Sequence, residues 1–94
     1  VQTCALPISD PKTSEIIIEL SKKVYDLVLE YKGSTTAEHN DGLIRSEYLE
    51  QMYGSEVYDL FKQTKAIFDP LNIFNPGKKV GGTFGDIEKD MRGA

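Results

Sequence analysis

The chain has 94 residues, a formal net charge of −4 and 39% hydrophobic residues. This length limits it to one domain or a piece of one, and the acidic balance argues against a general nucleic-acid-binding protein. No apolar run approaches the ~20 residues that a membrane-spanning helix needs. The single cysteine, Cys4, excludes an internal disulfide. We expect a soluble cytoplasmic protein, and the composition leaves peripheral association with the inner membrane open.

Residues 1–8 read Val-Gln-Thr-Cys-Ala-Leu-Pro-Ile, which resembles the translation of a common sequencing-library adapter. We interpret them as an artefact, so that the natural sequence begins near Ser9. The alternative is a natural extended leader. In either case they carry no functional inference.

A long amphipathic helix is predicted to begin at Asp10-Pro11, because Asp caps free backbone N–H groups and Pro is tolerated at the first helical position. Gly33 is expected to end this helix, since Gly adopts the left-handed conformation at little cost. Apolar residues at spacings of three and four form one stripe along it: Ile17, Leu20, Val24, Leu27, Val28 and Tyr31.

Residues 33–42 are small, polar and bracketed by glycines, which predicts an ordered loop with an optional short strand over residues 34–37. Ser46 is expected to cap a short helix that Gly54 ends.

Ser55 is expected to cap the next helix, and Asp69-Pro70 to close it, because the residue before Pro is disfavoured in the helical region. Its apolar stripe comprises Val57, Leu60, Phe61, Thr64, Ile67 and Phe68. Residues 75–78 read Asn-Pro-Gly-Lys and predict a turn. Residues 81–94 are expected to form a tail with a weak helix over residues 86–91.

The residues therefore predict a mainly α chain with about three helices joined by an ordered loop. These helices have apolar faces but no strong strands to cover. This pattern indicates that part of the hydrophobic core lies in sequence outside this chain.

Only Glu38-His39 combines titratable side chains with a glycine-bounded loop. His39 is the only histidine, and imidazole can take up or release a proton near neutral pH. Neighbouring side chains in an extended loop point to opposite sides, so we expect the two to serve different partners. Taken alone, such a pair is more often a solvated turn than an active site.

The order of these pieces resembles the C-terminal end of the FAD-linked oxidase family, which includes D-lactate dehydrogenases, glycolate oxidase subunits and 2-hydroxyglutarate dehydrogenases. The resemblance rests on Glu38-His39 and on Phe68-Asp69-Pro70 followed by the Asn-Pro-Gly-Lys turn. It implies that residues 9–80 are the C-terminal part of the family's α+β cap domain.

The resemblance also implies roles for four residues. His39 matches the family's general base, and Asn75 matches a residue that lies near the flavin ring. Glu38 matches a ligand for a divalent metal such as zinc, although the two upstream histidines that complete such a site have no counterpart in this sequence. Arg45 is expected to bind the substrate carboxylate, with a structural ion pair as the alternative. Asn40 stands where the family usually has Gly, and Asn tolerates the left-handed conformation best among the other residues.

These roles imply a fragment of an FAD-dependent oxidoreductase that oxidises a small 2-hydroxy acid, such as D-lactate or glycolate, by hydride transfer to flavin. The FAD is expected to be bound mostly by an N-terminal domain of the same polypeptide, outside this sequence. The alternative is a small helical protein-interaction module without catalytic activity.

Overall fold

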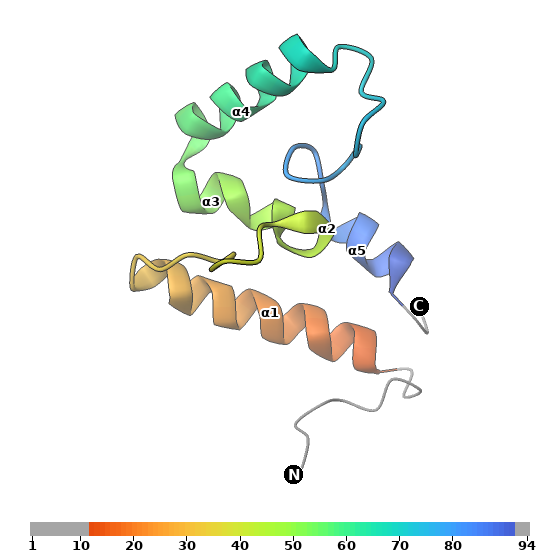
Figure 1. Ribbon diagram of the computed structural model, residues 1–94. Coiled ribbons are helices and arrows are strands. Elements are labelled where there is room, and N and C mark those ends of the chain that lie inside the picture. The colour runs from red at the N-terminus through yellow and green to blue at the C-terminus, as the bar shows by residue number, and fades with distance from the viewer. Residues whose placement is uncertain (1–11, 92–94) are drawn as a thin grey trace.

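The computed structural model describes residues 12–91, and this part of the chain is helical without a strand. Its elements are α1 (Thr13–Glu30), α2 (Gly42–Arg45), the 3-10 helix η1 (Ser46–Tyr48), α3 (Leu49–Tyr53), α4 (Ser55–Phe68) and α5 (Phe84–Asp90). Helix α4 follows α3 and packs against it (Figure 1). The connector after α4 then returns, so that α5 contacts both α1 and α2 (Figure 1).

The prediction of about three helices is too low, because the described residues also contain the unexpected short helix α2, and the weak helix expected in the tail forms as α5. The α+β character expected for the complete cap domain is not tested by residues 12–91, none of which forms a strand. No helix in this range is long and apolar enough to span a membrane. The interpretation of residues 1–8 falls outside the described residues and stays a prediction.

The first helix begins at Thr13, and the expected start at Asp10-Pro11 also lies outside the described residues. At its other end, the left-handed residue is Lys32, with φ of 57°, one position before the expected Gly33. Gly33 is required for a different reason. A Cβ atom there would lie 2.9 Å from Val28 Cγ1, because the chain turns closely over the end of the helix.

The apolar stripe of α1 is not its buried face. Ile18, Ser21 and Tyr25 face the rest of the molecule, with Ile18 only 8% exposed and the Tyr25 ring 4.6 Å from the Tyr48 ring. The predicted stripe stays open to solvent at Ile17 (40% exposed), Leu20 (53%), Val24 (47%), Leu27 (55%) and Tyr31 (79%). A contiguous exposed apolar face of this kind is typical of a surface that another structure covers.

The loop between α1 and α2 contains turns and no strand, so the optional strand over residues 34–37 does not form. Ala37 and Asn40 take positive φ angles of 46° and 62°, which bend the backbone away from an extended path. Asn40 thus provides the left-handed residue expected of it. The expected caps are wrong, because Ser46 lies in η1 and Ser55 is the first residue of α4, which follows Gly54 without a side-chain cap.

The two later helix ends agree with the sequence pattern. Gly54 ends α3 with φ of 84°, and α4 ends at Phe68. The weak helix expected over residues 86–91 is α5, which begins two residues earlier because Thr83 and Asp86 form a capping box.

Asp69 holds the connector after α4. Its carboxylate accepts the backbone N–H groups of Ile73 (2.9 Å) and Phe74 (3.0 Å), and it pairs with the Lys65 ammonium. The Lys65 hydrogen bond is the main cause that lowers the pKa of Asp69 below its ordinary value of 3.8. The ionised carboxylate is therefore the form that stabilises this turn.

We expect Asp69→Asn to reduce the acid sensitivity of the fold. Because the folded pKa is lowered, the stabilisation from Asp69 is present above about pH 4 and is lost as the pH falls through the folded pKa. The melting temperature at pH 7 should thus fall in the variant, while its further decrease toward pH 3 should be smaller than in the wild type. Asp59→Asn, at a half-exposed acid on α4, is the control. An equal acid dependence in Asp69→Asn and the wild type would contradict this assignment.

Candidate functional site

Glu38 and His39 lie in the loop between α1 and α2, and both side chains are open to solvent, at 88% and 68% exposure. The His39 Nε2 atom lies 3.9 Å from Glu38 Oε1. The expectation that they point to opposite sides is wrong, because it assumed an extended loop and the backbone here is turned. The imidazole can be reached by a molecule from outside the chain, with a carboxylate beside it.

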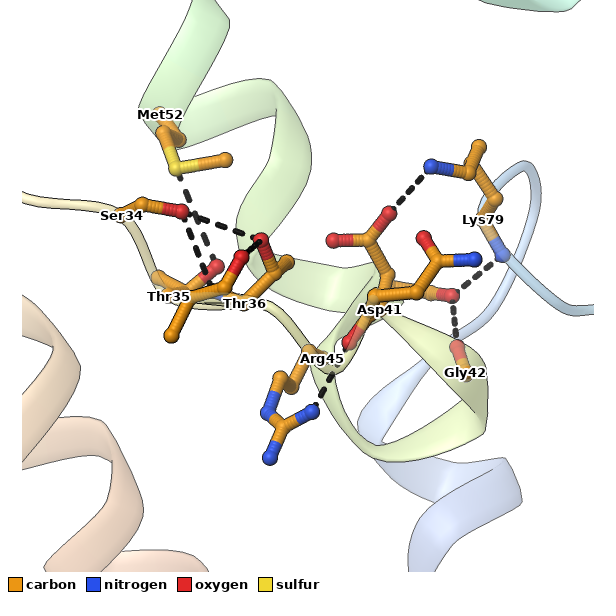
Figure 2. A network of polar contacts seen from close by, with 11 residues as sticks. Ser34, Thr35, Thr36, Asp41, Gly42, Arg45, Met52 and Lys79 are labelled. Atoms are coloured by element: carbon orange, nitrogen blue, oxygen red, sulfur yellow. Dashed lines mark hydrogen bonds and ion pairs between the residues drawn. The ribbon is translucent and has the colours of Figure 1, made fainter.

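The first half of this loop is held by hydroxyl groups. Thr35 is 5% exposed and its hydroxyl donates to Met52 Sδ on α3 at 3.8 Å. The Ser34 and Thr36 hydroxyls are 3.0 Å apart (Figure 2). The His39 backbone N–H donates to the Thr36 carbonyl at 2.8 Å. The backbone of His39 is therefore part of a closed turn.

Arg45 holds the second half of the loop. Its Nη1 donates to the Asn40 carbonyl at 2.8 Å, and its Nε donates to the Tyr25 hydroxyl on α1 at 3.2 Å. These contacts give Arg45 a structural role, because they link the loop to α1. They are hydrogen bonds, whereas the structural alternative expected from the sequence was an ion pair. The predicted contact with a substrate carboxylate stays a prediction.

Asp41 and Lys79 join the loop to the turn after residue 75. Asp41 is 3% exposed, and its Oδ2 lies 2.5 Å from Lys79 Nζ (Figure 2). The Ser46 hydroxyl donates to the Gly42 carbonyl and accepts the Lys79 backbone N–H, each at 2.5 Å. Sequence reasoning took Asp41 for a turn residue and did not consider Lys79. The sequence shows only that Asp41 directly precedes the next helix. A buried carboxylate needs a partner, but the sequence does not reveal that Asp41 is buried.

Asn75 borders an open hollow of about 470 Å³ beside α4. Its φ of 47° and the hydrogen bond from the Lys78 N–H to its carbonyl form the expected turn. The hollow is lined by three aromatic rings and by lysine side chains around this turn: Phe61, Phe68, Phe74, Lys65, Lys78 and Lys79. An amide beside aromatic rings is suited to one side of a planar heterocycle.

The described residues do not form a metal site. No group of three or more His, Cys, Asp or Glu side chains with suitable geometry occurs within residues 12–91. A catalytic zinc takes about three protein ligands, and Glu38 with His39 supplies at most two. A metal-binding role for Glu38 would therefore need ligands from outside this part of the chain.

The profile of the family described as "FAD linked oxidases, C-terminal domain" matches residues 2–79. The chain belongs to this family. The resemblance in the Glu-His loop and the Asn-Pro-Gly-Lys turn is thereby confirmed at the level of the family. The matched range also includes most of residues 1–8, whose interpretation stays a prediction.

Three relatives illustrate the range of this family. The glycolate oxidase subunit GlcD of Bacillus subtilis (strain 168) is 36% identical over 76 residues, which is 81% of this chain and 16% of that protein. The D-2-hydroxyglutarate dehydrogenase of Stutzerimonas stutzeri (strain A1501) is 41% identical over 63% of this chain and 13% of its own length. The D-lactate dehydrogenase of Archaeoglobus fulgidus is 37% identical over 66% of this chain and 14% of its own length.

This FAD-linked oxidase C-terminal domain thus spans less than one fifth of the relatives that it matches. No solved structure matches the chain. The residues around the hollow could contact only part of FAD, the family's cofactor. Asn75 and the aromatic rings around it would face one side of the flavin ring, and the remaining contacts would come from elsewhere in the polypeptide.

We expect Arg45→Ala to loosen the loop around His39. The variant removes two hydrogen bonds from a half-buried guanidinium, so the free energy of unfolding should fall by about 1–3 kcal/mol. Tyr25→Phe, which removes only one acceptor, should cost about 1 kcal/mol. Denaturant unfolding measures both losses, and amide hydrogen exchange at His39 should accelerate more in Arg45→Ala. Unchanged exchange at His39 would show that Arg45 does not hold the loop.

Proposed function

We propose that this chain is the C-terminal part of an FAD-dependent enzyme that oxidises a small 2-hydroxy acid by hydride transfer to flavin. The observation that carries the proposal is the exposed imidazole of His39 on a loop that is held at both ends, in a chain of this family. The named relatives act on glycolate, D-2-hydroxyglutarate and D-lactate, which share a hydroxyl group on the carbon next to a carboxylate.

The chemistry requires the loss of two hydrogens from one alcohol. The hydride leaves the carbon with its electron pair, and the hydroxyl proton must leave as well, so that the C–O bond becomes a carbonyl. FAD, when bound, supplies the acceptor for the hydride. His39 is proposed to take the hydroxyl proton on its imidazole, because a neutral imidazole is suited to proton transfer near neutral pH.

Two further residues have roles in this proposal. Arg45 uses donors for Asn40 and Tyr25, and a guanidinium has five N–H donors, so others remain for a substrate carboxylate. Asn75 is proposed to donate a hydrogen bond to the flavin ring. Its position at the edge of an aromatic-lined hollow supports this contact.

The alternative function, a helical interaction module without chemistry, is favoured by the exposed apolar faces of α1 and α4. The family assignment accounts for the same faces, because the chain spans a small part of much longer relatives.

We expect His39→Ala in the full-length flavoenzyme to slow flavin reduction by about 10²-fold or more, because the general base is lost. Single-turnover absorbance at the flavin band, with D-lactate, glycolate and D-2-hydroxyglutarate as substrates, measures the rate. Glu56→Gln, a change at an exposed side chain on α4 that has no part in holding this loop, is the control and should stay within about threefold. A near-normal rate in His39→Ala would remove His39 from the mechanism.

The isolated 94-residue chain is expected neither to retain FAD nor to oxidise D-lactate, since it offers contacts to only one side of the ring. Purification followed by a visible spectrum tests this directly. A yellow preparation with stoichiometric flavin would contradict the expected division of the cofactor site.

A further inference from the structure

The carboxylate of Asp41 is buried two residues after His39, in a loop that is otherwise mostly exposed. Its Oδ2 pairs with Lys79 Nζ at 2.5 Å, and its Oδ1 has no hydrogen-bond partner in the described part of the chain. Separating a buried carboxylate from its cation would strongly destabilise the fold. The ion pair therefore keeps the loop close to Lys79.

Lys79 is attached a second time through its backbone. Its N–H donates to the Ser46 hydroxyl, and that hydroxyl donates to the Gly42 carbonyl. Ser46 is 2% exposed. Two attachments to neighbouring points restrict both the position and the direction of the chain at Lys79.

The segment after the turn also packs closely against Ser46. A Cβ atom at Gly82 would lie 2.8 Å from Ser46 Cβ and 2.5 Å from the Gly77 carbonyl oxygen. The backbone after the Asn-Pro-Gly-Lys turn therefore approaches η1 at Ser46 so closely that only glycine fits at position 82.

We infer that Lys79 is a positioning residue for the oxidation, acting with Asp41 to set His39 relative to Asn75. This inference rests on the proposed function, in which His39 meets the substrate hydroxyl and Asn75 meets the flavin. The proton and the hydride must leave the same substrate, so the base and the flavin must both be in place at once. Displacements of about 1 Å in such geometry cost about 10²-fold in rate.

Lys79 does not act on the substrate in this arrangement. Its ammonium is already paired with Asp41, and its route to the loop passes through that carboxylate. Lys23 on α1 also has its ammonium in an ion pair, with Glu19 at 2.7 Å, but both side chains are exposed and neither lies in the loop or lines the hollow, so Lys23 serves as the matched control.

The test compares Lys79→Met, Lys79→Arg and Lys23→Met in the full-length flavoenzyme. We expect Lys79→Met to lower the limiting rate of flavin reduction by about 10–10²-fold, with a change in substrate KM below about threefold and unchanged FAD content. Lys79→Arg, which keeps the charge, should recover most of the rate. Lys23→Met, which breaks an exposed ion pair on α1, should stay within about twofold of the wild type.

A second readout does not depend on activity. Hydrogen exchange in the peptide that contains His39 should accelerate in Lys79→Met and in Asp41→Asn, and not in Lys23→Met. If Lys79→Met does not fold, Asp41→Asn takes its place under the same criteria. Normal flavin reduction in a folded variant without the ion pair would overturn the inference, and so would a rate loss that Lys79→Arg does not relieve.

The outcomes also separate this inference from the function on which it rests. If His39→Ala reduces its flavin at the normal rate, the proposed function fails. If His39→Ala is slow while Lys79→Met is normal, the function stands and only the positioning role of Lys79 is wrong.

Discussion

The burial of one carboxylate organises the functional end of this molecule. Asp41 is 3% exposed and must be matched by a cation, and the only ammonium that it contacts within the described residues comes from Lys79, far along the chain. Ser46 reinforces the same junction with two hydrogen bonds. Both segments meet there, so the Glu-His loop and the segment after the turn at Asn75 are joined by direct contacts.

The remaining described structure consists of helices that share only a small hydrophobic core. Its buried apolar side chains are Ile18, Tyr48, Leu49 and Ile87 in the described part of the chain. Larger apolar surface stays open on α1, on α4 and around Phe74, which is 68% exposed. Such faces are costly in water and are typical of surfaces that other parts of a protein cover. The chain spans 16% of the glycolate oxidase subunit that it matches.

The pattern of exposed and buried side chains in the Glu-His loop agrees with the proposed chemistry. The side chains of Glu38 and His39 are exposed, while the residues that hold their loop, Thr35, Asp41 and Ser46, are buried. A base must reach a substrate that binds from outside the chain, whereas its position must be set by contacts that do not move. In the proposed function, these helices would supply positioning and a bound flavin would supply the redox chemistry.

The sequence by itself determined the family, the ends of helices at Gly54 and Asp69-Pro70, and the Glu38-His39 pair as the candidate site, because these depend on local backbone preferences and short motifs. It did not determine which face of α1 is buried, since Ser21 and Tyr25 pack inward through specific contacts while the apolar stripe stays open. Only the tertiary structure decided that Glu38 and His39 lie on the same side and that Lys79 pairs with Asp41. Those arrangements depend on left-handed residues in the loop and on segments that are distant in the chain, which no local pattern encodes.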